Sequence, residues 1–354
     1  MGQKIIVALS LLLFARGAAQ GQGVPGGAGA HGGAGIAPLH GVPVHDPVMI
    51  RQDSTYYVFC TGMGISVWSS PDRMHWHKES PVFPQPPAWA GQLVPGYRGH
   101  TWAPDISFYQ GAYYLFYAVS TFGKNNSAIG LAVNKTLHAD APGFHWDDRG
   151  MVIHSIPGRD LWNAIDPNLA VDSAGQPWLT FGSFWEGIKL VRLRPDLGGP
   201  AVPERWYTLA SRGRDAGLAD TLAGNGAIEA PFIVHHGDWY YLFVSFDYCC
   251  RGAASNYRVM VGRSHTIYGP YADREGVPMT QGGGTPVVQG DERWHGAGHN
   301  AVCTFDGVDY ILYHAYDATQ RGVSLLRIDR LRWDGAQWPV ADTSGTAERL
   351  PVTY

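Results

Sequence analysis

The chain has 354 residues and a formal net charge of −4, with 16% charged residues against 12% aromatic ones, including 13 Trp and 18 Tyr. This length allows one large domain or two medium ones, and an aromatic-rich, charge-poor composition favours an all-β protein with many buried or ligand-facing rings. The slightly acidic balance argues against a nucleic-acid partner and against electrostatic attachment to an anionic membrane.

The chain begins with the pattern of an export signal. A lysine precedes an apolar run at residues 5–14 that is too short to span a bilayer, and Gly17 and Ala19 supply the small residues of a cleavage site. We therefore predict a signal peptide over residues 1–19, followed by a flexible Gly-rich leader over residues 20–38. The mature protein is expected to be secreted or periplasmic.

Four cysteines are few for a chain of this length, so we expect a fold that does not depend on disulfides, although an exported protein allows them. They are Cys60, Cys249, Cys250 and Cys303. A bond between adjacent cysteines is rare because the ring that it closes is strained, and the sequence leaves the pairing of the four open. CxxC spacing is absent, which argues against a structural zinc site.

From residue 39 onward, one pattern occurs five times. Each unit opens with a polar residue and continues as two β-prone runs around a turn that contains Gly or Asp, followed by a third β-prone run. The opening residues recur about every sixty residues, and about four strands per unit at this period are typical of β-propeller blades. We therefore predict one all-β domain, a five-bladed β-propeller over residues 39–354. The five opening residues are Asp46, Asp105, Asp166, Glu229 and His299.

In a propeller, the first strand of each blade lines a central channel, so equivalent positions of the five blades face one axis. Three Asp, one Glu and one His are then expected to converge at one end of the channel. Like charges held close together cost free energy unless solvent, a cation or a function offsets them. The five residues together therefore predict a functional site. Each opening residue taken alone is at least as consistent with a solvated residue that begins a strand.

Seven segments near the opening residues are distinctive, and "HDP", "IDPN" and "IEAP" among them occur in order at blade spacing: "HDP", "GHTWAPDI", "WNAIDPN", "GSFW", "AIEAP", "FDYCCRG" and "GHN". Together they resemble the arabinanases of glycoside hydrolase family 43. The resemblance implies a five-bladed propeller and an exported endo-1,5-α-L-arabinanase. Such an enzyme cleaves the α-1,5-L-arabinofuranosidic bonds of arabinan, a side chain of plant cell-wall pectin, with inversion.

Carried over position by position, the resemblance makes Asp46 the general base and Glu229 the general acid. Asp166 becomes the residue that modulates the pKa of the acid and orients it. An inverting glycosidase needs two carboxyl groups because one protonates the leaving oxygen while the other activates water on the opposite face of the sugar. A neighbouring carboxylate raises the pKa of the acid by like-charge repulsion.

His299 matches a histidine that contacts a divalent cation at the channel centre. The resemblance implies calcium, held mostly through water. Calcium prefers six to eight oxygen ligands, and the sequence contains no EF-hand loop, so water has to supply most of them. Without the resemblance, His299 is more simply a histidine at the start of a strand.

Substrate contacts are expected from aromatic rings, which pack on the apolar faces of sugars, and from a few polar partners. The resemblance places Trp102 and Phe122 in the substrate cleft. Each candidate is nearly as consistent with a core or surface role, and His45 is as consistent with a structural role as with one near the site. The remaining substrate-binding candidates are Asp105, Asn168, Ser183, Phe184 and Trp185.

Two alternatives stay open. One is a β-xylosidase or α-L-arabinofuranosidase of the same family, and the other is a carbohydrate-binding propeller without catalysis, which would need a missing acid or base. We expect arabinan and arabino-oligosaccharides as ligands, a monomer, and neither a nucleic-acid nor a membrane partner. The motifs do not determine endo or exo action, because this depends on loops at the ends of the groove.

Overall fold

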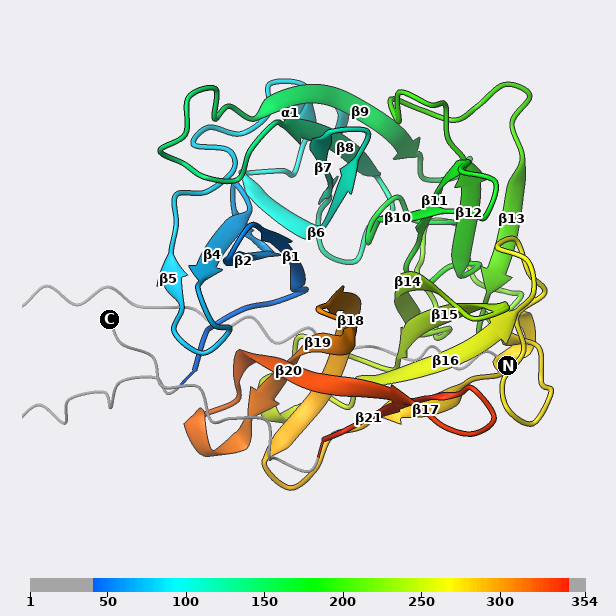
Figure 1. The fold of residues 1–354 in the computed structure, drawn as a ribbon. Coiled ribbons are helices and arrows are strands. Elements are labelled where there is room, and N and C mark those ends of the chain that lie inside the picture. Colours follow the sequence, from blue (N-terminus) through cyan, green and yellow to red (C-terminus); the bar gives the residue numbers. More distant parts are fainter. Residues whose placement is uncertain (1–40, 344–354) are drawn as a thin grey trace, which may run out of the picture. The chain divides into compact units, whose positions relative to one another are not determined.

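The computed structural model describes residues 41–343, so the predicted signal peptide and leader lie outside the described residues. The described chain folds into five antiparallel sheets, four of four strands and one of five, with the strands of each in sequence order. Figure 1 shows the sheets arranged around a common centre, with β1, β6, β10, β14 and β18 innermost. Each of these inner strands contacts the next around the ring, and β18 contacts β1. The prediction of an all-β, five-bladed propeller is confirmed.

The strands of each blade run from the channel outwards. Blade 1 contains β1 (Val48–Gln52), β2 (Thr55–Cys60), β4 (Ser66–Ser70) and β5 (His77–Lys78). Blade 2 contains β6 (His100–Tyr109), β7 (Ala112–Val119), β8 (Ser127–Asn134) and β9 (Asp147–Ser155), with the short β3 (Gly62–Met63) paired to β6. Blade 3 contains β10 (Asn168–Val171), β11 (Pro177–Phe181), β12 (Ile188–Arg192) and β13 (Trp206–Ala210).

Blade 4 contains β14 (Ile228–His236), β15 (Trp239–Phe246), β16 (Arg258–Ser264) and β17 (Thr285–Val288). Blade 5 contains β18 (Trp294–Phe305), β19 (Val308–Asp317), β20 (Val323–Trp333) and β21 (Pro339–Ala341). The helices are short: α1 (Ala90–Leu93), η1 (Gly252–Ala254), η2 (Met279–Gln281) and η3 (Ala318–Gln320). Among residues 41–343, no helix has the length and apolar character needed to cross a membrane.

The hairpins predicted between the first and second strands are confirmed in all five blades. In blade 2, Gln110 and Gly111 form the turn with φ of 46° and 84°. In blade 5, Asp306 and Gly307 do the same with φ of 53° and 76°. Two consecutive positive φ angles give the turn whose twist matches that of the flanking strands.

The core lies between neighbouring blades. Successive residues of a strand face opposite sides of the sheet, so each middle strand packs against two neighbours. In β7, Leu115 joins the buried cluster shared with blade 1, and Phe116 joins the cluster shared with blade 3. In β15, Leu242 joins the cluster shared with blade 3, and Phe243 joins the cluster shared with blade 5. This packing fixes the inner strands relative to one another.

The first described residues close the ring. Pro43 forms a β-bridge with Leu325 at the start of β20, Val44 N–H donates to the Ser324 carbonyl at 3.3 Å, and Leu326 N–H donates to the Val42 carbonyl at 2.9 Å. A segment that precedes blade 1 therefore pairs with blade 5, and the two ends of the ring are joined by backbone hydrogen bonds.

Candidate active site

A shared backbone feature marks the innermost strand of every blade. One residue, within the strand or two positions before it, has a positive φ, a conformation uncommon outside glycine that clusters at functional sites. Proline follows this residue in four blades and Asn300 follows it in the fifth. The five residues are Asp46 (φ 54°), Ala103 (41°), Asp166 (57°), Ala230 (56°) and His299 (51°).

This feature corrects the predicted alignment of the blades. The positive-φ residue of blade 2 is Ala103, two residues before Asp105, and that of blade 4 is Ala230, one residue after Glu229. The prediction that all five opening residues are equivalent is therefore wrong for Asp105 and Glu229. The recurring X-Pro dipeptide gives the correct register, because it marks a backbone conformation, whereas a polar side chain does not.

The neighbouring blade holds this strained backbone in place. At four of the five positions, a side chain of the preceding blade accepts the backbone N–H. The pairs are Asp46 with His314 Nδ1 (3.1 Å), Ala103 with Thr61 Oγ1 (2.8 Å), Ala230 with Asp166 Oδ2 (3.1 Å) and His299 with Ser245 Oγ (2.8 Å). Contacts between blades thus determine where the site side chains point.

Asp46 is buried and its carboxylate accepts three hydrogen bonds. Thr61 Oγ1 donates to Oδ2 at 2.5 Å, and the Nδ1 atoms of His45 and His299 lie 2.8 and 3.0 Å from Oδ1. Burial by itself would raise the pKa of Asp46, but the two imidazoles hold it well below its usual range. His314 Nδ1 also lies 3.7 Å from Oδ1, but this atom accepts the Asp46 N–H and so has no proton to donate.

Asp166 and His299 interact electrostatically with both Asp46 and Glu229. Burial, assisted by the charges of Glu229 and Asp46 and opposed by His299, raises the pKa of Asp166 to about 8. Burial would lower the pKa of His299, but Asp46 and Asp166 raise it to about 9. The structure therefore brings together four of the predicted site residues.

Glu229 is held on both carboxyl oxygens. Ser183 Oγ donates to Oε2 and the Tyr257 hydroxyl donates to Oε1, each at 2.6 Å. Tyr257 is fully buried, and burial together with the Glu229 charge raises its pKa well above the usual value, so the hydroxyl keeps its proton. The structure thus places Ser183, a predicted sugar contact, against the predicted acid. Tyr257 lies in the loop between β15 and β16, and no motif in the sequence marks it as a site residue.

Asp105 and Asn168 link blades and do not offer free polar atoms to a sugar. Asp105 accepts from Leu169 N–H at 2.8 Å and from Asn168 Nδ2 at 3.3 Å, while Asn168 Oδ1 accepts from Ile233 N–H at 2.9 Å. Only 3% of Asp105 and 2% of Asn168 are exposed. Both stand two residues after the positive-φ residue of their blades, so the same link joins blade 2 to blade 3 and blade 3 to blade 4. This corrects the expectation of substrate contact for both.

Of the predicted aromatic contacts, Trp185 also belongs to the core. It is 2% exposed, and its indole N–H donates to the Asp220 carbonyl at 2.8 Å. Trp102 and Phe184 are half-buried, and Phe122 is 80% exposed. The Trp102 indole donates to His100 Nδ1 at 2.9 Å, and the Phe184 ring lies 6.0 Å from Tyr248. These three rings keep accessible surface.

His45 has more partners than the sequence suggested. Its Nε2 lies 2.7 Å from the Tyr316 hydroxyl, and its ring stacks on that of His314 at 3.9 Å. His314 and Tyr316 both lie in β19 and were not foreseen. His314 pairs with the residue before His299, and Ser245 pairs with the residue before Ala230, so an alignment of second strands on the X-Pro register would have found His314.

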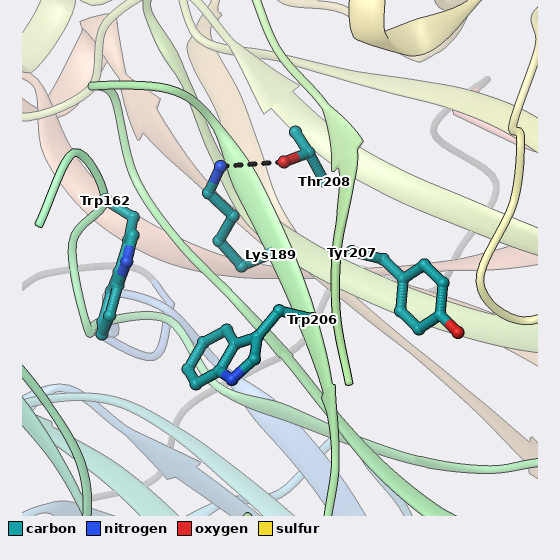
Figure 2. Close-up of a pocket in the computed structure, with 5 residues that line it drawn as sticks. All are labelled: Trp162, Lys189, Trp206, Tyr207 and Thr208. Carbon is teal, nitrogen blue, oxygen red and sulfur yellow. Dashed lines mark hydrogen bonds between the residues drawn. The ribbon is translucent and has the colours of Figure 1, made fainter. Parts of the chain in front are cut away.

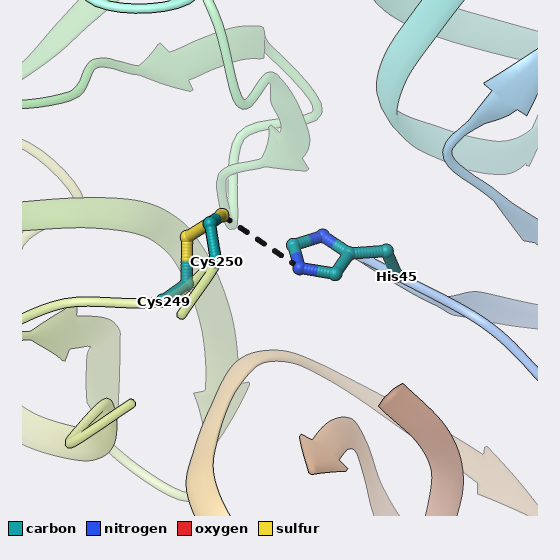
Figure 3. Close-up of side chains that lie close together, drawn as sticks. All are labelled: His45, Cys249 and Cys250. Atoms are coloured by element: carbon teal, nitrogen blue, oxygen red, sulfur yellow. Dashed lines mark hydrogen bonds between the residues drawn. A yellow bond between two sulfur atoms is a disulfide. The ribbon is translucent and has the colours of Figure 1, made fainter. Parts of the chain in front are cut away.

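Cys249 and Cys250 are bonded to each other, the pairing that the sequence made least expected, while Cys60 and Cys303 are free. Figure 3 shows this disulfide beside the imidazole of His45. It lies in the loop between β15 and β16, which also carries Tyr248 and Tyr257.

Two groups of side chains within residues 41–343 have the spacing of metal ligands, and neither contains His299. They are His45 with Cys249 and Cys250, and His45 with Asp46 and His314. In the first group the sulfur atoms are bonded to each other. In the second, His45 and His314 already bind Asp46 through Nδ1. Neither offers the oxygen-rich set that calcium prefers.

A separate pocket lies on the outer part of blade 3. Figure 2 shows Trp162 and Trp206 beside Lys189, whose Nζ donates to Thr208 Oγ1 at 2.9 Å. The two indole rings lie 5.4 Å apart. None of the four converging site residues lines this pocket, so it is distinct from the candidate active site.

Comparisons with known proteins agree with this geometry. Residues 37–339 match the family described as glycosyl hydrolases family 43. An extracellular exo-α-(1→5)-L-arabinofuranosidase of Cellvibrio japonicus is 50% identical over 85% of this chain and 87% of its own length. An extracellular endo-α-(1→5)-L-arabinanase of Bacillus subtilis is 40% identical over 84% of this chain and 87% of its own.

Among solved structures, an α-L-arabinanase of Cellvibrio cellulosa in complex with arabinohexaose is 47% identical and superimposes with a TM-score of 0.87. The alignment covers 88% of this chain and 100% of that one. The native arabinanase of Bacillus subtilis is 40% identical with a TM-score of 0.74, over 84% of this chain and 97% of that one.

Proposed function

The chain belongs to glycosyl hydrolases family 43, and we propose that it is an exported enzyme that hydrolyses α-1,5-linked L-arabinofuranose chains with inversion. The observation that carries this proposal is the contrast between two carboxyl groups on different blades. Imidazoles surround Asp46 and keep it ionised, whereas two hydroxyl groups hold Glu229. Inversion requires one carboxylate that deprotonates water and one carboxyl that protonates the leaving oxygen.

Asp46 acts as the general base. A carboxylate offers about four acceptor positions, and three are occupied by Thr61, His45 and His299, which leaves one for the attacking water. The water transfers a proton to Asp46 as its oxygen bonds to the anomeric carbon. The three donors fix the plane of the carboxylate, and their hydrogen bonds stabilise its unprotonated form before the reaction.

Glu229 acts as the general acid and transfers a proton to the glycosidic oxygen as the bond to the anomeric carbon breaks. Asp166 binds the N–H of Ala230, the residue after Glu229, and so positions the strand that carries the acid. Burial, assisted by the charge of Glu229, raises the pKa of Asp166 to about 8, so Asp166 retains a proton beside the acid near neutral pH.

Arabinan and arabino-oligosaccharides are the substrates that the relatives support, since those relatives are named arabinanases or arabinofuranosidases. Trp102, Phe184 and Phe122 supply rings for the apolar faces of the sugars. Relatives named as extracellular enzymes support secretion, and we propose that the enzyme works as a monomer.

The relatives include both exo- and endo-acting enzymes, so the position of cleavage needs its own assignment. We propose endo action. A time course on linear arabinan tests this, because endo cleavage gives a ladder of oligosaccharides, whereas exo or processive cleavage gives one early product.

A hydrated cation near His299 forms part of the proposal. Asn300, the next residue, is buried, and both of its side-chain polar atoms lack a partner among the described residues. Orphaned buried polar atoms call for water or an ion. His299 Nδ1 is engaged with Asp46, and the raised pKa of this imidazole leaves a proton on Nε2, so an ion beside it would be held through water and not by the ring nitrogen. Bound calcium would add positive charge beside the carboxylates.

The test of the proposed function compares Asp46→Asn with Glu229→Gln. Both should lose nearly all hydrolysis of linear arabinan. On an aryl arabinofuranoside, whose leaving group needs little protonation, Glu229→Gln should recover activity and Asp46→Asn should not. NMR of the first product should show the β-anomer. Retention of the α-anomer, or near-normal rates in both variants, would refute the mechanism.

A further inference from the structure

The disulfide Cys249–Cys250 lies beside the residues that hold the proposed general base, yet the mechanism above does not use it. Figure 3 shows its sulfur atoms facing the imidazole of His45. Cys250 Sγ is 3.8 Å from His45 Nε2, a long and weak contact to sulfur. The Tyr316 hydroxyl lies 2.7 Å from the same nitrogen and is therefore its closer and stronger hydrogen-bond partner.

Three hydrogen bonds connect the backbone of Cys250 to Asp46. The Cys250 N–H donates to the Tyr316 oxygen at 2.8 Å, Tyr316 bonds to His45 Nε2, and His45 Nδ1 meets Asp46 Oδ1 at 2.8 Å. An amide only donates, so the Tyr316 oxygen accepts there, which leaves its own proton available for donation to Nε2. A neutral imidazole whose Nε2 accepts carries its proton on Nδ1, the atom that faces Asp46. We call this chain of bonds the Cys250–Asp46 relay.

The loop that begins the relay is held in one conformation. Cys250 has a φ of 66°, which a non-glycine residue adopts only under constraint, and its side chain is tied to the preceding residue. Asp247, at the start of the loop, pairs with Arg212 at 2.7 Å and with Arg258 at 3.0 Å. The Cys250 amide is therefore fixed relative to Tyr316.

We propose that the Cys249–Cys250 disulfide is a positioning element for catalysis, which fixes the Cys250 amide against Tyr316 and so selects the His45 tautomer that donates to Asp46. The inference rests on the proposed role of Asp46 as the base. Reduction releases Cys250 from its strained conformation and removes the first donor of the relay. The enzyme is then sensitive to reductants through a disulfide to which no substrate contact is assigned.

The first experiment separates the relay from general stability. Tyr316→Phe removes the middle of the relay and should lower kcat on arabinan about tenfold to hundredfold, the cost of a misplaced catalytic group, with KM changed less than threefold. Tyr313→Phe is the matched control. It lies in the same strand and removes a hydroxyl that donates to Asp329 at 2.6 Å, outside the relay, so kcat should stay within about twofold.

The second experiment opens the disulfide chemically. Tris(2-carboxyethyl)phosphine reduces Cys249–Cys250 to two thiols and is itself oxidised to the phosphine oxide with oxygen from water. Since Cys60 and Cys303 are free, no other disulfide in residues 41–343 responds. Reduction should lower kcat about as much as Tyr316→Phe does, and reoxidation should restore it. The double variant Cys249→Ser/Cys250→Ser should start low and not respond.

A third measurement reads the relay without any substrate. In protein labelled with 15N in its histidine rings, at a pH where His45 is neutral, NMR should show a protonated Nδ1 that is lost in Tyr316→Phe and after reduction. A proton on Nε2 in the parent protein would overturn the inference, as would unchanged kcat in fully reduced enzyme. If the relay were intact but the protein did not cleave arabinan, the proposed function would be refuted and the inference about the His45 tautomer would stand.

Discussion

Asp105 should give the protein a stability that rises as the pH falls. Its carboxyl is buried and accepts hydrogen bonds from Leu169 N–H and Asn168, and burial raises its pKa from 3.8 to about 6. The folded state therefore binds the proton more tightly than the unfolded chain. Stability is lower by a constant amount above pH 6, increases as the pH falls through 6, and levels off below 3.8.

The magnitude follows from these two pKa values. Between pH 7.5 and pH 5, protonation of Asp105 should add about 1.4 kcal/mol to the free energy of unfolding, out of about 3 kcal/mol for the complete transition. Asp105→Asn removes the titrating group. Its amide NH2 then faces one of the two donors, Leu169 N–H or the Asn168 amide, which lowers the free energy of unfolding by about 1–3 kcal/mol at every pH.

Urea unfolding of both proteins at several pH values measures the difference. Other buried acids, including Asp166, contribute equally to both and cancel. Asp140→Asn, the same change at an exposed position, serves as the control and should track the parent protein. If the parent gained no stability over Asp105→Asn on going from pH 7.5 to pH 5, or lost some, the assignment of a raised pKa to Asp105 would be incorrect.

Three further results are expected. Tyr257→Phe removes one of the two donors to Glu229 and should lower kcat about tenfold with little change in KM; steady-state kinetics that show only a KM effect would contradict its role in holding the acid. Trp102→Ala should raise KM for arabino-oligosaccharides about tenfold through loss of a ring contact, and calorimetric titration into an inactive Glu229→Gln background should show the same loss; undiminished binding would remove Trp102 from the cleft. Dialysis against a chelator should lower activity, and added Ca²⁺ should restore it; a metal analysis that finds less than one tenth of an ion per chain in active enzyme would rule out the cation near His299.

The sequence predicted the architecture well because the blade repeat is local. Each hairpin depends on a few turn residues, such as Gln110 with Gly111, and each strand on its alternation of faces, as at Leu115 and Phe116. These signals need no knowledge of distant contacts, so the five blades and their hairpins could be read from the chain.

The register of the site was harder to predict. An alignment of the blades by polarity fails at two of them, because a polar side chain serves equally well as a catalytic group, as at Asp46, or as a link between blades, as at Asp105. The X-Pro dipeptides carry the better signal. Tyr257, Tyr316 and the disulfide could not be predicted, because their contacts with Glu229, His45 and Asp46 arise only when distant segments meet.

The seam where the ring closes has a consequence for when activity can appear. Asp46 belongs to the first blade, but His299 and His314 belong to the last, and the His45 bond to Tyr316 spans 271 positions along the chain. The proposed acid, by contrast, is assembled between two consecutive blades, from Glu229, Ser183 and Tyr257. A chain that has emerged only as far as its fourth blade can build the acid but not the base. The enzyme can therefore be active only after the two ends of the propeller have joined. A change that breaks the β-bridge at Pro43 should abolish activity under conditions in which the protein is still folded.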